Sequence, residues 1–122
     1  MSISPSEKIK VSIEGNIATV MIDNPSANTW DRESLPALKA VVEALNAEPT
    51  VYALVLTGAG EKFFSAGADL NQFASGDADV ARAVGEAFGE AFETLADFRG
   101  VSIAAINGFA MGGGLEVALA CD

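Results

Sequence analysis

One carboxylate stands in an otherwise uncharged stretch near the C-terminal end of the sequence. Glu116 is the only charged residue in positions 109–121, and it follows three consecutive glycines, Gly112–Gly114. Its neighbours Leu115 and Val117 predict dry surroundings, which favour proton exchange by a carboxyl group. A purely structural role is also open, because a negative charge in the first turn of a helix gains roughly 0.3 to 1 kcal/mol from the helix dipole.

Two segments of the chain repeat one order of residues: a buried apolar strand, a glycine, and then small residues before a helix. The first runs from Val55 to Ser65–Ala68, and the second runs from Ala105 to Gly112–Gly114. Small residues let a ligand approach the main chain, and N–H groups at the start of a helix lack an internal partner, so they can bind an anion. Two such turns side by side would hold one oxyanion. The same glycines are equally explained by tight turns and close contacts between helix and sheet.

The elements that must position these turns alternate between strands and helices. Gly15 and Asn16 separate two β-rich runs in residues 8–22, which predicts an opening hairpin. Apolar residues at three- and four-residue steps over 35–45 predict a helix, and we expect Ser34 rather than Asp31 to cap it.

The remaining elements predict an α/β fold. The continuous apolar runs 51–58 and 101–106 are typical of strands covered on both faces. A long helix is predicted from Asp77 or Asp79 to about Arg99, and a buried helix is predicted to follow the three glycines. The glycines within the long helix disfavour it, which predicts close approach by another backbone; they are Gly85 and Gly89.

Charge and composition exclude several classes of function. The sequence has 122 residues, of which 17 are acidic and 7 basic, so its net charge is -10. With no Lys/Arg cluster to follow a phosphate backbone, nucleic acid is not an expected partner. No phosphate-binding loop of the GK[ST] type is present, and "GAGEKF" has Phe63 where a dinucleotide-binding motif needs its third glycine.

Membrane insertion and secretion are not expected either. Residues 101–121 are long enough for a span, but Asn107, Glu116 and four glycines weaken it and no basic cluster flanks it. The single cysteine, Cys121, and the absence of a secretory signal fit a reducing cytoplasm. We interpret Cys121 and Trp30 as packing residues.

Two motifs together carry a family resemblance. "FFSAGADL" followed by "AAINGFAMGGGLEVALACD" is similar to the crotonase family, the enoyl-CoA hydratases and isomerases, and the likeness covers nearly the whole chain. The resemblance implies an α/β fold built as a spiral of ββα units, an acyl-CoA substrate, and a homo-oligomer that is a trimer or a hexamer at full length.

The resemblance also assigns roles to single residues. It implies that the N–H groups of Ala68 and Gly113 form an oxyanion hole for the thioester carbonyl, and that Glu116 is the first of two glutamates that position and deprotonate water. No metal or redox cofactor is implied, since coenzyme A is part of the substrate. The substrate-binding positions that it implies are Ala66, Gly67, Asp69, Leu70 and Gly112.

The second glutamate of the hydratases is expected about 20 residues further on, after one more strand and loop. We therefore expect residues 1–122 to be the N-terminal portion of a single crotonase-fold domain, truncated after the first part of the spiral, with its end inside the last helix. Enoyl-CoA hydration is the favoured reaction, because isomerases of the family often lack a carboxylate at position 116. Isomerisation, acyl-CoA hydrolysis and a noncatalytic assembly role remain alternatives.

Overall fold

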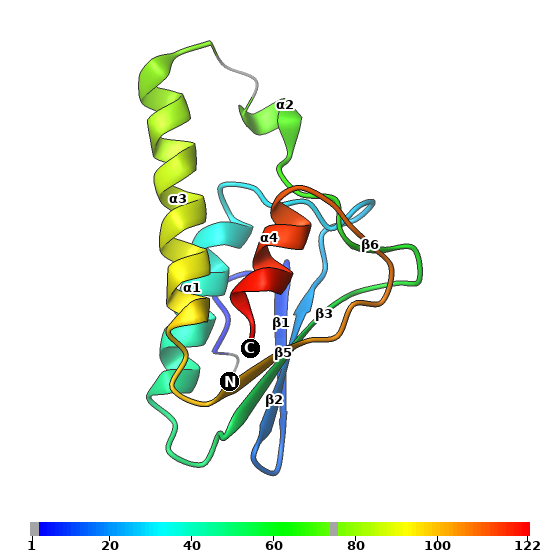
Figure 1. Cartoon of the computed structure of the whole chain (residues 1–122), viewed down its shortest axis with the longest axis vertical. Helices are drawn as coiled ribbons and strands as arrows, with labels where there is room; N and C mark the ends of the chain where they lie inside the picture. The colour runs from blue at the N-terminus through cyan, green and yellow to red at the C-terminus, as the bar shows by residue number, and fades with distance from the viewer. Residues whose placement is uncertain (1–2, 74–75) are drawn as a thin grey trace.

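The computed structural model describes residues 3–73 and 76–122 of the chain. It contains both strands and helices, with each pair of consecutive strands followed by one or two helices (Figure 1). In chain order they are β1 (Ile9–Glu14), β2 (Ile17–Ile22), α1 (Ser34–Asn46), β3 (Ala53–Gly58), β4 (Phe63–Ser65), α2 (Leu70–Phe73), α3 (Ala78–Ala96), β5 (Val101–Ala104), β6 (Phe109–Ala110) and α4 (Gly113–Ala120).

Four of the strands form the main sheet, in the order β1-β2-β3-β5. The first pair is antiparallel, with Glu14 opposite Ile17, so the predicted hairpin is confirmed. The pairs β2–β3 and β3–β5 are parallel, with helices in the connections, as expected for an α/β chain. A second, two-stranded parallel sheet joins β4 to β6.

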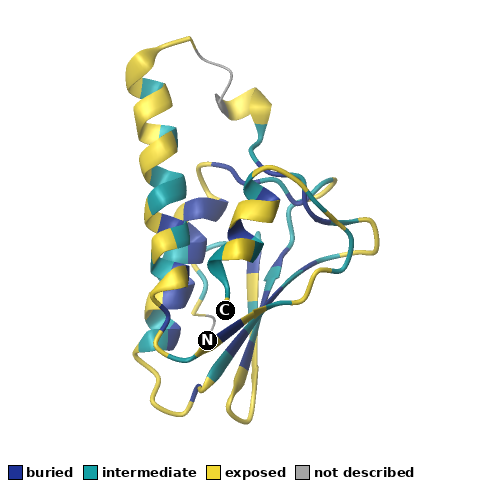
Figure 2. Ribbon diagram, in the orientation of Figure 1, coloured by how far each residue is buried: buried dark blue, intermediate teal, exposed yellow. Residues whose placement is uncertain are grey.

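Helix α1 supplies much of the core, because apolar side chains make up its buried face apart from Ser34 at its start. It packs against α3 and β1, and it is almost entirely buried over that face (Figure 2). The predicted spacing is confirmed: the buried apolar residues of the helix are Leu35, Ala37, Leu38, Val41, Val42 and Leu45.

Ser34 is the first residue of α1 and Glu33 occupies the N-cap position without a side-chain cap bond, so the prediction that Ser34 caps the helix is wrong; the Asp31 side chain accepts from the N–H groups at its start instead. The Asp31 carboxylate accepts from the Ser34 N–H (2.7 Å) and the Glu33 N–H (2.9 Å), while the Ser34 hydroxyl accepts from the Asp31 N–H (2.9 Å). Burial disfavours ionisation of Asp31, but the hydrogen bond from Lys8 and those backbone N–H groups outweigh it and hold its pKa below the usual value. The Lys8 ammonium group, 2.7 Å away, favours Asp31 as the capping residue.

Helix α3 begins where predicted, with the Asp77 side chain accepting from the Asp79 N–H (2.7 Å), but it ends at Ala96 rather than near Arg99. The prediction that another backbone approaches its glycines closely is wrong. Within the described chain, no atom lies within 4 Å of a methyl group placed on Gly85 or Gly89. These two positions face open space.

Strand β5 and helix α4 are less buried than their apolar sequences predict. Val101 and Ile103 of β5 are 52% and 49% exposed, and Leu119 of α4 is 75% exposed. β5 lies at the edge of the main sheet, so no described strand covers its outer side. The expectation that the chain ends within the helix is also wrong: Cys121 is extended, and the Asp122 N–H donates to the Ser102 carbonyl oxygen (2.9 Å) beside β5.

No helix in residues 3–73 and 76–122 is long and apolar enough to cross a membrane.

Candidate functional site

The small second sheet brings the two glycine-containing turns together. Phe63 pairs with Phe109, Ser65 pairs with Ala110, and the Met111 N–H donates to the Ser65 carbonyl oxygen (3.0 Å). The segment that follows β4 and the segment that follows β6 therefore lie side by side, although they are far apart in the sequence.

Two buried or partly buried asparagines connect the loops that lead into these turns. The Asn107 amide donates to the carbonyl oxygens of Gly60 (3.0 Å) and Phe63 (3.1 Å), and its oxygen accepts from the Gly58 N–H (3.0 Å). The Asn28 amide also donates to the Phe63 carbonyl oxygen (3.1 Å). Our sequence interpretation assigned neither of them a structural role; the available signal was a polar residue directly after an apolar strand, at Asn107.

Two glycines make the contact between the turns possible. Gly67 has a φ of +94°, and a methyl group on it would lie 2.9 Å from the Met111 carbonyl oxygen and 3.1 Å from the Gly113 nitrogen. A methyl group on Gly114 would lie 2.0 Å from the Ser65 carbonyl oxygen, far inside contact distance. Close packing therefore explains Gly67 and Gly114, and the same packing sets Gly113 beside the Ala68 turn.

Two backbone N–H groups at this contact have no acceptor in the described part of the chain. Two hydrogen bonds join Trp30 to the residues on either side of Ala68. The Trp30 N–H donates to the Gly67 carbonyl oxygen (2.7 Å), and the Asp69 N–H donates to the Trp30 carbonyl oxygen (2.8 Å). The Ala68 N–H, which lies between these two bonds, has no acceptor among the described residues. Gly113 is the first residue of α4, so its N–H has no partner within the helix. These free donors are available to an anionic or carbonyl oxygen.

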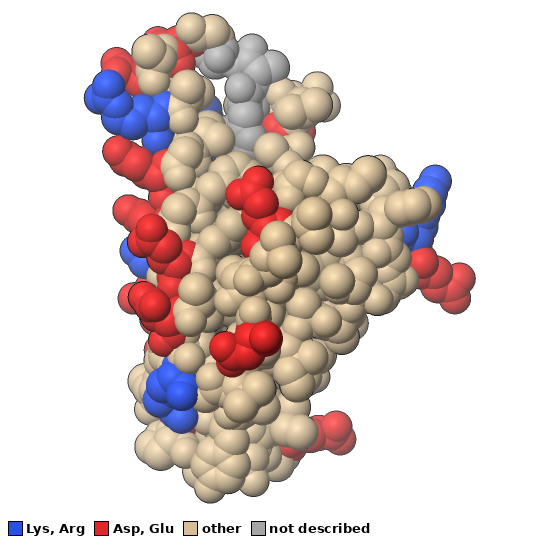
Figure 3. All heavy atoms as spheres, in the orientation of Figure 1, with Lys and Arg blue, Asp and Glu red and all other residues tan. Residues whose placement is uncertain are grey.

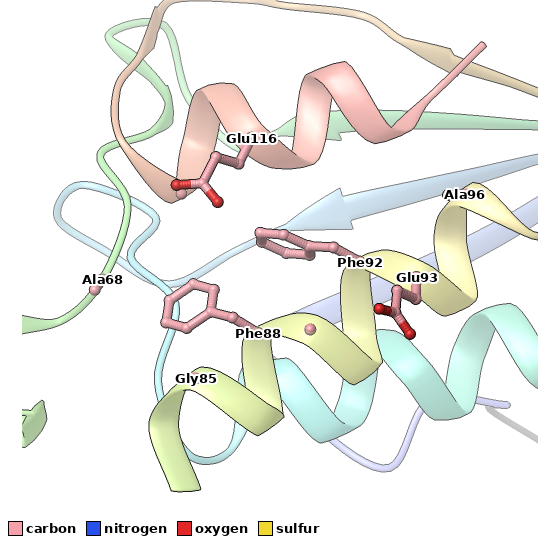
Figure 4. Close-up of a pocket in the computed structure, with 9 residues that line it drawn as sticks. Ala68, Gly85, Phe88, Phe92, Glu93, Ala96 and Glu116 are labelled. Carbon is pink, nitrogen blue, oxygen red and sulfur yellow. The ribbon is translucent and has the colours of Figure 1, made fainter. Parts of the chain in front are cut away.

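Ala68, Gly113 and Glu116 line one pocket of about 650 Å³. Its other wall is α3, which our sequence interpretation did not place at the site (Figure 4). That helix contributes Gly85, Phe88, Gly89, Phe92, Glu93 and Ala96. The spacing of Phe88 and Phe92 indicated an apolar helix face but not its position relative to the turns.

The other five predicted site residues do not line this pocket. They lie close in sequence to Ala68 or Gly113, which do line it, and Leu70 is 75% exposed. The positions concerned are Ala66, Gly67, Asp69, Leu70 and Gly112.

Glu116 lies in the first turn of α4, with its carboxylate on the side that faces α3 (Figure 4). The expectation of dry surroundings is wrong for this chain: Glu116 is exposed, and Leu115 next to it is 46% exposed. In the first turn it also complements the positive end of the helix dipole, so the structural and chemical roles are compatible.

Of the two residues interpreted as packing residues, Trp30 is fully buried and Cys121 is partly buried. Trp30 is completely buried and packs edge-on against Phe92, with ring centroids 5.8 Å apart. Burial raises the pKa of the Cys121 thiol, which disfavours the reactive thiolate. Among the described residues, no group of three or more His, Cys, Asp or Glu side chains is arranged to hold a metal ion.

Comparison with known proteins gives consistent matches. Residues 12–122 match a family profile described as enoyl-CoA hydratase/isomerase. A crotonyl-CoA hydratase of Syntrophomonas wolfei is 38% identical over 95% of this chain and 45% of its own length. A carnitinyl-CoA dehydratase of Salmonella arizonae is 39% identical over 96% of this chain and 44% of its own length.

A solved structure of Pseudomonas aeruginosa DspI is 62% identical, with a TM-score of 0.94, over 96% of this chain and 48% of that one. The chain thus spans about half the length of the relatives it matches.

Proposed function

Because this chain belongs to the enoyl-CoA hydratase/isomerase family, we propose that its pocket binds the thioester end of an enoyl-CoA and supports addition of water across the 2,3 double bond. The observation that carries the proposal is the convergence of two acceptor-free backbone N–H groups and one carboxylate on a single pocket. The names of the two sequence relatives describe the addition and the removal of water at two different CoA thioesters, which are opposite directions of one type of reaction.

The Ala68 and Gly113 N–H groups would stabilise the reacting thioester. When water adds at the β carbon, negative charge moves onto the thioester oxygen and an enolate-like state forms. Two fixed donors lower the energy of that state, and loss of one donor costs about 3 to 4 kcal/mol in comparable sites. Gly67 and Gly114 hold the two turns together, so we assign them a positioning role.

Glu116 would take a proton from the attacking water. Its carboxylate lies on the pocket wall next to Gly113, where water can reach it because the side chain is exposed. The family resemblance implies a second glutamate, which residues 1–122 do not include, as the group that would give a proton to the α carbon. For the CoA portion we keep the predicted positions beside the pocket, which are Ala66, Gly67, Asp69, Leu70 and Gly112.

The test compares the full-length protein with its Glu116→Gln variant, since the second acid of the mechanism lies outside residues 1–122. Loss of crotonyl-CoA absorbance reports hydration, and calorimetric titration with butyryl-CoA reports binding. We expect hydration to fall at least about 100-fold in Glu116→Gln, because general base catalysis is removed, while binding is retained. Glu86→Gln, an exposed change outside the pocket, is the control and leaves both unchanged.

Equal hydration by the full-length protein and by Glu116→Gln would remove Glu116 from the mechanism. Absence of hydration by the full-length protein would contradict the catalytic part of the proposal, and absence of butyryl-CoA binding would contradict all of it.

A second candidate function, assembly without catalysis, is favoured by the exposed apolar residues of β5 and α4. Val101, Ile103 and Leu119 are each about half exposed or more, and β5 is an open sheet edge in the described chain. Light scattering alongside the butyryl-CoA titration separates the two functions. Oligomers that bind no acyl-CoA would favour assembly, whereas acyl-CoA binding favours the enzyme, for which we propose a homo-oligomer.

A further inference from the structure

Trp30 contacts both turns of the site. Its N–H donates to the Gly67 carbonyl oxygen (2.7 Å) and its carbonyl oxygen accepts from the Asp69 N–H (2.8 Å), so its main chain holds the residues on both sides of Ala68. Its side chain reaches the other turn, because the ring carbon Cδ1 lies 3.5 Å from the position of a methyl group placed on Gly113. One residue therefore joins the two segments that carry the free N–H groups.

The indole ring also contacts the wall of the pocket that α3 provides. It packs edge-on against Phe92, with the ring centroids 5.8 Å apart and the ring planes at 70°, and Phe92 packs in the same way against Phe88. Both phenylalanines line the pocket (Figure 4). A methyl group placed on Gly113 would lie 3.0 Å from a ring carbon of Phe88. The three rings therefore connect α3 to the turn at Gly113.

The main chain of Trp30 is fixed from both directions along the sequence. Asn28 is 3% exposed, and its side-chain amide donates to the carbonyl oxygens of Ala59 (3.0 Å) and Phe63 (3.1 Å). Asp31 is 1% exposed, and its carboxylate accepts from the N–H groups at the start of α1. Trp30 lies between these two buried polar residues, so its own position is well defined and it can hold its neighbours in place.

Stability alone does not explain a tryptophan at position 30. The ring is completely buried, yet its N–H group has no partner in the described part of the chain. A buried donor without an acceptor destabilises a fold, and an apolar side chain at this position would avoid that cost. Residues that lower stability in this way are expected at functional sites, which indicates that the large indole ring serves the site.

We infer that Trp30 is a positioning residue for the proposed reaction: its main chain orients the Ala68 N–H, and its ring places Gly113 so that both donors meet one thioester oxygen. The inference rests on the proposed function, in which these two donors stabilise the enolate-like state. Such donors act most strongly on the charge that develops during the reaction, and a displacement of about 1 Å can lower a rate about 100-fold. Trp30 therefore governs the rate of hydration more than the affinity for the thioester.

The test measures hydration by the full-length protein and by its Trp30→Phe and Trp30→Leu variants. Both variants keep the main-chain bonds and reduce the side chain next to Gly113, Trp30→Leu by more. We expect kcat for crotonyl-CoA to fall at least about tenfold in Trp30→Phe and about 100-fold in Trp30→Leu. Calorimetric titration with octanoyl-CoA, a saturated thioester that cannot be hydrated, should give dissociation constants within about threefold of the value for the unaltered protein.

An infrared measurement reports the two donors directly. Hydrogen bonds to a thioester oxygen polarise the C=O bond and lower its stretching frequency. Bound octanoyl-CoA, isotopically labelled at its carbonyl carbon, should show this lowering in the unaltered protein, less of it in Trp30→Phe and least in Trp30→Leu. A loss of packing that left both donors in place would not change the frequency.

Phe98→Leu is the matched control, because it also reduces a buried aromatic side chain. Phe98 is 7% exposed, does not line the pocket and lies beside Gly100, after the C-terminal end of α3. Thermal unfolding should show a lower midpoint for Phe98→Leu than for the unaltered protein. Its kcat and its carbonyl frequency should remain those of the unaltered protein.

Equal kcat in Trp30→Leu and Phe98→Leu would overturn the inference and leave the proposed function standing. So would a carbonyl frequency that is the same in Trp30→Leu as in the unaltered protein, or a loss of octanoyl-CoA affinity as large as the loss of kcat. Absence of hydration by the unaltered full-length protein would overturn the proposed function itself.

Discussion

At the scale of single residues, the site depends on glycines, whose lack of a side chain leaves room for neighbouring atoms or for open space. Gly114 lets α4 pack against the β4 segment, because the Ser65 carbonyl oxygen occupies the place of its missing side chain. Gly89 faces open space instead, although both glycines lie within helices. These two positions form a matched pair that distinguishes a glycine required by packing from one that faces open space.

Gly114→Ala should therefore destabilise the chain, whereas Gly89→Ala should stabilise it. A methyl group on Gly114 would be 2.0 Å from a backbone oxygen that cannot turn away, and overpacking of this kind costs about 1 to 3 kcal/mol. Gly89→Ala should add about 1 kcal/mol through helix propensity. Urea denaturation measures both; equal effects of the two changes would refute the packing argument.

Asp31→Asn should lower stability by about 2 kcal/mol at neutral pH, because an amide keeps the helix cap but loses the charge-assisted bond from Lys8. The folded pKa of Asp31 lies below its ordinary value of 3.8, so its charge stabilises the fold above that pH. The free-energy difference between the two proteins should shrink as the pH falls below 3.8. A difference that persists unchanged in acid would show that the charge is not responsible.

At the scale of elements, the site is held by a very short sheet and by an asparagine. β4 and β6 contribute few backbone pairs, so the Asn107 side chain supplies bonds that a longer strand pair would provide. Asn107→Ala removes the bonds that Asn107 makes to the Gly58 N–H and to the Gly60 carbonyl oxygen. We expect unfolding free energy to fall by about 1 to 3 kcal/mol and octanoyl-CoA binding to weaken.

Asn16→Ala is the control for this change, since it removes one exposed bond to the Thr50 carbonyl oxygen far from the pocket. Unfolding in urea and the octanoyl-CoA titration should both distinguish the two variants. If Asn107→Ala behaves like Asn16→Ala in both measurements, the asparagine does not hold the turns.

At the scale of the whole molecule, the net charge of -10 opposes the approach of a phosphorylated ligand. Acidic side chains line α3 in Figure 3, and α3 forms one wall of the pocket. Added salt screens this repulsion: the screening length falls from about 30 Å at 0.01 M to about 8 Å at 0.15 M. The association rate of octanoyl-CoA should therefore rise severalfold over that range.

Stopped-flow measurement of Trp30 fluorescence gives this rate. An octanoyl thioester of N-acetylcysteamine, which has no phosphate, serves as the control and should associate at a rate that salt does not change. A rate for octanoyl-CoA that falls with salt would mean that local positive charge, rather than net charge, governs its approach.

Several features followed from the sequence because they depend on near neighbours. The Gly15-Asn16 hairpin, the buried face of α1 and the start of α3 each rest on spacing within one segment, and all three predictions are confirmed. The incorrect predictions concern what lies opposite a segment. The cap of α1 depends on Lys8 of another segment, and the exposure of β5 and α4 depends on which elements cover them.

The sequence by itself determined the chemistry available to this protein: small residues at two turns, free N–H groups at a helix start, and one carboxylate after three glycines. Those properties belong to short stretches of chain, so spacing reveals them. Only the tertiary structure decided that α3 forms one wall of the pocket and that Gly89 of this helix faces open space. That outcome depends on contacts between segments distant in sequence, which arise from packing of the whole chain and have no local pattern.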